Sequence, residues 1–133
     1  MVRQTTQEVT VSADSIFQPQ YSDPEKELYV HAYRIRIAND GAHPVQLLSR
    51  SWEVIDATGA RRLVEGEGVV GQQPVILPGQ FHEYTSWVQF ETPIGAMQGT
   101  YLMKRQSASP RQGGELFQVE VPRFLHVATE VLN

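Results

Sequence analysis

The feature that most constrains this chain is the alternation of apolar and polar side chains along short segments. The clearest case is residues 27–40, where Tyr33, Ile35 and Ile37 fall on one side of an extended chain and two arginines fall on the other. Residues 116–121, LFQVEV, alternate in the same way. A period of two residues is typical of a half-buried strand, and no segment keeps the i, i+3, i+4, i+7 spacing of an amphipathic helix. We therefore expect strands throughout.

The spacing of these segments predicts the fold class. Further strand-like runs, each bounded by turn-forming residues, occupy 8–11, 45–56, 81–90, 97–104 and 124–132. About seven short strands without crossover helices indicate an all-β, two-sheet antiparallel β-sandwich. The length of 133 residues fits one domain over 1–133.

The second long strand carries an irregularity in its apolar phase. Val45 and Leu47 are odd-numbered, whereas Leu48, Trp52 and Val54 are even-numbered. A strand cannot change phase without a bulge, which we expect near residues 48–50. Trp52 is expected in the core between the sheets.

Composition excludes several classes of site and partner. The chain has no cysteine, so disulfides, thiolate catalysis and zinc–thiolate sites are excluded. The formal net charge is −4 and the basic residues are scattered, which argues against nucleic acid as a partner. No apolar run approaches the roughly 20 residues of a membrane helix, and the polar start shows no secretory signal. We expect a cytoplasmic protein without a membrane partner.

The string GEGVVG at residues 66–71 matches the glycine pattern G-x-G-x-x-G of dinucleotide-binding loops. Such a loop needs a helix that starts within it, and Pro74 and Pro78 would interrupt that helix. We therefore interpret the glycines as backbone geometry in a connection. The alternative is an anion nest that uses loop amides with nearby arginines, and its candidate residues are Gly66, Gly68, Gly71, Arg61 and Arg62.

Several ordered stretches resemble the ApaG family. They are LLSRSWEVIDATG (47–59), EGEGVVGQQPVILPGQFHEYTS (65–86), TPIGAMQGTYLM (92–103) and FQVEVPRFL (117–125). The resemblance implies a sandwich of the fibronectin type III or immunoglobulin-like kind. It also implies a protein-binding module, because the domain is fused within F-box proteins and DNA-polymerase-interacting proteins in eukaryotes. The bacterial family is associated with cobalt resistance and magnesium efflux, and this chain departs from its pattern at Trp87 and Gln72.

Catalytic and metal-binding patterns are not found in the sequence. The four histidines do not share a ligand spacing, so we expect each to be exposed or capped, with no metal site and no cofactor. No G-x-S-x-G elbow occurs, and no catalytic residue is assigned.

The sequence leaves two functions open. A non-catalytic module that binds a protein partner would use an exposed aromatic patch, whose candidates are Phe81, Tyr84, Trp87 and Phe90. The alternative is weak binding of pyrophosphate or a nucleotide at the Gly66–Gly71 loop.

Overall fold

The computed structural model describes residues 1–106 and 114–129. Residues 107–113, which the sequence predicts as a turn-rich loop, and residues 130–133 of the last expected strand lie outside the described part. The described residues form nine strands and two short 3-10 helices. These elements are β1 (Val2–Thr6), β2 (Val9–Phe17), η1 (Pro19–Tyr21), η2 (Pro24–Lys26), β3 (Tyr29–Asn39), β4 (Val45–Asp56), β5 (Arg61–Glu67), β6 (Val75–Ile76), β7 (Phe81–Phe90), β8 (Ile94–Arg105) and β9 (Glu115–Val127).

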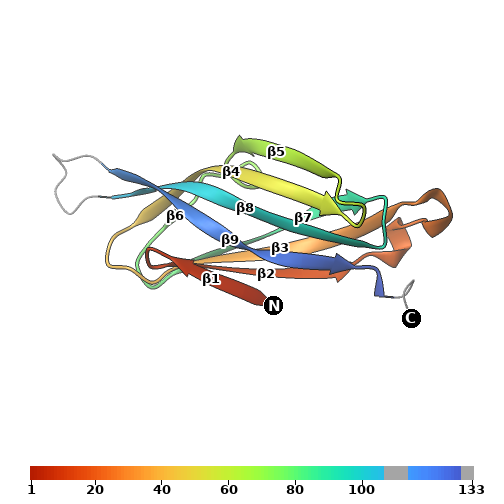
Figure 1. Cartoon of the computed structure of the whole chain (residues 1–133). Helices are drawn as coiled ribbons and strands as arrows, with labels where there is room; N and C mark the ends of the chain where they lie inside the picture. Colours follow the sequence, from red (N-terminus) through yellow and green to blue (C-terminus); the bar gives the residue numbers. More distant parts are fainter. Residues whose placement is uncertain (107–113, 130–133) are drawn as a thin grey trace.

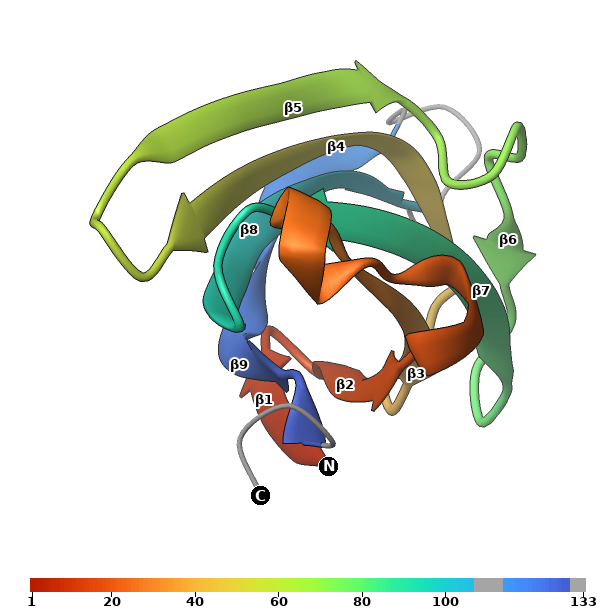
Figure 2. The same ribbon diagram turned by 90° about the vertical axis from the view of Figure 1, so that its right-hand side faces the viewer.

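The strands form two antiparallel sheets that face each other (Figure 1). One sheet has the order β1-β2-β3-β7, and the other has the order β5-β4-β8-β9 with β6 paired to β4. Seen from one end, β1 lies beside β9 on one flank of the sandwich, while β5 and β7 bound the other flank (Figure 2). The predicted all-β antiparallel sandwich is confirmed.

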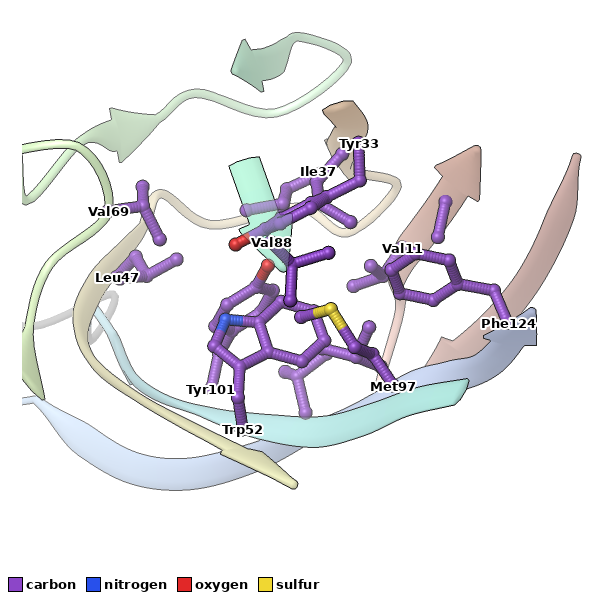
Figure 3. Packing of buried hydrophobic residues seen from close by; sticks show 14 of the residues in the cluster. Val11, Tyr33, Ile37, Leu47, Trp52, Val69, Val88, Met97, Tyr101 and Phe124 are labelled. Carbon is purple, nitrogen blue, oxygen red and sulfur yellow. The ribbon is translucent and has the colours of Figure 1, made fainter. Parts of the chain in front are cut away.

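The core fills the space between the sheets. Trp52 from β4 and Tyr101 from β8 point toward Tyr33 and Val88 of the opposite sheet (Figure 3). Trp52 is 2% exposed, which confirms its predicted place in the core. Gly99 makes room for it, because a Cβ there would lie 2.2 Å from the Ser51 carbonyl oxygen and 3.1 Å from the indole ring.

The irregularities of β4 and β9 follow the phase of their buried residues. The pairing of β4 with β8 shifts register between Leu47 and Ser49, so the predicted bulge is confirmed at Leu48. The odd-numbered residues of β9 are buried from Phe117 to Val121, and Phe124 and His126 are buried after it. Its pairing with β8 shifts between Met97 and Gly99, which accommodates this second change of phase.

The amino-terminal region contains more strand than the sequence predicted. The expected strand at 8–11 is part of the longer β2, which forms a hairpin with β1 that pairs from Val2–Ala13 to Thr6–Val9. Gln7 and Glu8 form its turn with φ of 46° and 67°. β1 is exposed at the edge of its sheet, so its residues VRQTT carry no apolar alternation that could reveal it.

Candidate functional site

The glycine loop begins inside β5. Gly66 is a strand residue paired with Arg50, and a Cβ at this position would lie 2.8 Å from Nη1 of the Arg50 guanidinium. That guanidinium donates to the carbonyl oxygens of Glu67 and Gly68, at 3.2 and 3.0 Å. Gly66 thus leaves room for the Arg50 side chain, which holds the end of β5 through these two hydrogen bonds.

The rest of the loop is a tight turn. The amide of Val69 donates to the Gln72 carbonyl, and the Gln72 amide donates back to Val69. Val70 and Gly71 between them have φ of 48° and 75°, as in a type I′ turn. The Gly68 amide donates to the Leu48 carbonyl at 2.9 Å. Three amides of the loop, of which that of Gly68 belongs to a candidate residue, are therefore engaged in backbone bonds.

The two arginines proposed for the nest lie at the opposite end of β5 from Gly66. Arg61 forms an ion pair with Glu53, whose pKa is lowered first by a hydrogen bond from Gln98 and then by Arg61. Arg62 donates to the Gln89 carbonyl of β7 at 2.9 Å. The structure therefore does not gather the five candidate residues, and anion binding by the loop stays a prediction.

The four aromatic candidates of β7 divide between its two faces. Phe90 is 3% exposed in the core, and Tyr84 is half-buried with its hydroxyl bonded to that of Tyr101. Burial raises the pKa of both tyrosines. Phe81 and Trp87 are about half exposed on the outer face, so only these two of the four candidates are exposed.

Trp87 is accompanied by apolar neighbours that the sequence did not indicate. Its ring packs edge-on against that of Tyr21 in η1, with ring centroids 5.5 Å apart. Ile16, Ala32 and Trp87 occupy one row across β2, β3 and β7. Tyr21, Ile16 and Trp87 are 60%, 47% and 53% exposed. We call these three residues the aromatic patch. Phe81 lies six residues away along the strand, under the Arg36 guanidinium.

A cavity of about 830 Å³ opens beside the aromatic patch. It runs between the two sheets at the flank bounded by β5 and β7. Trp52 is one of its lining residues, and the buried indole Nε1 of Trp52 has no hydrogen-bond partner among the described residues. The lining residues are Tyr21, Val30, Tyr33, Trp52, Val54, Arg62, Val64, Trp87, Val88, Gln89 and Met97.

The sequence analysis missed a pair of buried histidines. His31 and His126 are 0% exposed, and their ring centroids lie 5.1 Å apart. Ser15 bonds to Nδ1 of His126 at 2.7 Å, whereas neither ring nitrogen of His31 has a partner among the described residues. Burial lowers the pKa of His31 to about 4 and that of His126 to about 3. The expectation that every histidine is exposed or capped is wrong for His31, because the two residues come from strands 95 positions apart in sequence.

Within the described part of the chain, no cluster of three or more histidine, aspartate or glutamate residues could hold a metal ion. None of the helices found there has the length and apolar character needed to cross a membrane.

The sequence pattern that defines the ApaG domain matches residues 19–105. The chain belongs to the ApaG family. It is 43% identical over 128 residues to the protein ApaG of Anaeromyxobacter sp. strain K, with 96% of each chain covered. It is 42% identical over 126 residues to the protein ApaG of Bordetella pertussis, with 95% of this chain and 92% of the relative covered.

A crystal structure from Bordetella pertussis is similar across nearly the same span. It superposes with a TM-score of 0.83 at 42% identity and covers 90% of this chain and 92% of its own. The match to the ApaG domain includes β3 to β8 and therefore β5 and β7, the strands that bound the cavity.

Proposed function

We propose that this ApaG-family chain is a non-catalytic module that binds a protein partner through the aromatic patch. The observation that carries the proposal is the exposed pair of Trp87 and Tyr21 at the mouth of the cavity. Tryptophan and tyrosine are enriched among residues that dominate binding energy at protein interfaces. About half of the Trp87 side chain is exposed, and together with Tyr21 and Ile16 it forms an apolar surface that is available to a partner.

The position of the patch supports this function. Trp87 and Ile16 share one row on the outer face of their sheet, and buried Ala32 lies between them. Because Ala32 is buried, the larger side chains around it cover it, and the apolar surface between Ile16 and Trp87 is continuous. The same proposal places the module in the cytoplasm and treats the association with cobalt resistance and magnesium efflux as an effect exerted through the partner.

Site-specific photo-crosslinking tests this proposal. A photoreactive phenylalanine analogue replaces Trp87 in one variant, and Leu116, an exposed apolar residue of β9, in the matched control. We expect a discrete protein adduct from position 87 in extracts of the source organism, and none from position 116. Tyr21→Ser should reduce that adduct without changing stability by more than about 0.5 kcal/mol. Equal adducts from both positions, or none from position 87, would contradict the proposal.

A further inference from the structure

The outer edge of β7 presents unpaired backbone groups. The Gln89 carbonyl accepts a hydrogen bond from the side chain of Arg62 and so points away from β3. Backbone groups of alternate residues in a strand point to the same side. The amides and carbonyls of Glu83, Thr85 and Trp87 therefore also point outward, and no strand of the described chain pairs with them.

This edge lacks two of the features that usually protect an edge strand, a bulge and a proline. β7 pairs with β3 in continuous register from Tyr29–Phe90 to Ala38–Phe81, without a bulge. It contains no proline over its ten residues. Proteins usually blunt such an edge, because it is a template for pairing with another chain. At the opposite flank the edge strands of the two sheets are in contact, because the Glu120 amide of β9 donates a hydrogen bond to Thr6 Oγ1 of β1.

The cavity meets this edge directly. Three consecutive residues of β7, 87 to 89, line it. Neighbouring side chains of a strand point to opposite faces, so a cavity lined by all three faces the strand's edge. Val54, Arg62 and Val64 of β4 and β5 line the same cavity from the other sheet. A strand placed beside β7 would lie beneath β5.

Two residues that line the cavity, Trp52 and Arg62, carry polar groups that indicate what such a strand would carry. The Trp52 Nε1–H is a buried donor without a partner in the described chain, and buried donors are normally satisfied. Arg62 adds a positive charge on the cavity-facing side of β5, where it pairs with Val54. Both groups suit an acceptor oxygen, and the guanidinium favours a carboxylate.

We propose that β7 binds an extended peptide as an additional strand of its sheet. Alternate apolar side chains of the peptide lie in the cavity beneath β5, and an aspartate or glutamate on the same face pairs with Arg62. Glu83, Thr85 and Trp87 supply the backbone hydrogen bonds, and Arg62 ends the pairing by occupying the Gln89 carbonyl. This inference rests on the proposed protein-binding function and names the form of the partner.

A second copy of this chain fits the edge less well than a separate peptide. In a β7-to-β7 pairing, the cavity-facing residues of the added strand would be His82, Tyr84, Ser86, Val88 and Phe90. None of them is acidic, so Arg62 would meet no carboxylate. Val88 and Phe90 are moreover buried in their own core.

The test uses peptides selected from a phage-displayed library of random 12-residue sequences on the wild-type protein. We expect enriched sequences to alternate apolar residues with others and to contain one acidic residue. Synthetic versions of a selected peptide, each N-methylated at one backbone position, should lose about tenfold or more in affinity at every second central position and little between them. This pattern arises because only alternate amides of an added strand face β7.

Protein variants test the two contacts separately. Thr85→Pro removes an outward amide and should weaken binding about tenfold, whereas Thr85→Val should not. Arg62→Ala should weaken the acidic peptide at least fivefold, and Arg61→Ala is the matched control because its side chain pairs with Glu53. If Thr85→Pro fails to fold, amide hydrogen exchange of the wild-type protein replaces it. The amides of Glu83, Thr85 and Trp87 should then become protected when peptide binds.

The outcomes separate this inference from the proposed function. Failure to enrich any peptide, an N-methyl scan without alternation, or unchanged exchange at the three β7 amides would overturn strand addition. If the crosslink at position 87 is nevertheless found, protein binding through the aromatic patch stands. Concentration-dependent dimerisation that Thr85→Pro abolishes, with no peptide selected, would assign the edge to a second copy and overturn the peptide proposal.

Discussion

Replacing His31 with leucine should flatten the dependence of stability on pH. His31 is fully buried, and burial lowers its pKa to about 4 from a value near 6.5 in the unfolded chain. Leucine has a similar volume and needs no hydrogen bond, whereas neither ring nitrogen of His31 has a partner in the described chain.

The size of the effect follows from proton linkage. Above pH 6.5 the His31 ring is neutral in both states, so its contribution is constant. As the pH falls below 6.5, the unfolded chain binds the proton and the folded chain does not, so stability falls by about 1.4 kcal/mol per pH unit. Between pH 6.5 and pH 5 this amounts to about 2 kcal/mol. His126, with a folded pKa of about 3, adds a similar loss in the wild-type protein.

Urea unfolding at pH 7, 6 and 5, followed by tryptophan fluorescence, measures this effect. His31→Leu should be more stable than wild type by about 2 kcal/mol more at pH 5 than at pH 7. His43→Gln, in the turn after β3, is the matched control, because it also removes one histidine but lies outside the buried core. The lowered pKa values of Glu53 and Asp56 do not interfere, because their contributions are lost only as the pH falls below about 4.5. Equal slopes for His31→Leu and wild type would refute the reasoning.

Three further predictions concern the core and the glycine loop. Trp52→Ala should destabilise the protein by about 3–5 kcal/mol, because the Trp52 ring fills the centre of the core. Trp87→Ala should cost under about 1 kcal/mol in the same urea assay. Similar losses of stability for both variants would contradict the assigned burial. Val70→Asn should raise stability by about 1 kcal/mol in thermal melts, because Val70 has φ of 48° in a type I′ turn that favours Asn-Gly. A lower melting temperature for this variant would show that the backbone of Val70 is not strained. Millimolar ATP or pyrophosphate should leave the melting temperature unchanged, because the amides of Gly68, Val69 and Gln72 already donate to backbone carbonyls. A ligand at 100 times its dissociation constant would add about 2.7 kcal/mol, so a clear upward shift would restore the anion nest.

The alternation of apolar and polar residues was sufficient to predict burial wherever burial depends only on which face of its own strand a residue occupies. The alternation in β3 and β9 identified Ile35, Ile37 and Val119 as core residues, and the phase change in β4 located the bulge at Leu48. Trp52 was placed correctly because sandwich domains commonly bury a tryptophan between their sheets. These properties follow from the two-residue period of a strand that has one buried face.

Short pairing segments were not visible in the sequence. β1 is an exposed edge strand, and β6 has only two residues, so neither shows a hydrophobic period. The sequence also identified the aromatic residues of β7 without resolving their faces. Pairing with β3 directs Tyr84 and Phe90 inward and leaves Trp87 outside.

The candidate site itself depends on tertiary structure, because its members come from separate strands. Arg62 lies near the glycine loop in sequence, yet β5 carries it away from Gly66 and toward Gln89 of the other sheet. His31 and His126 meet through the packing of the two sheets, and Tyr21 reaches Trp87 from η1. The sequence by itself determined the long strands β3, β4, β7, β8 and β9, most of their buried faces, and the family. The order of strands decided which edge stays unpaired and which side chains surround it, because hydrogen bonding between strands acts between segments far apart in the chain.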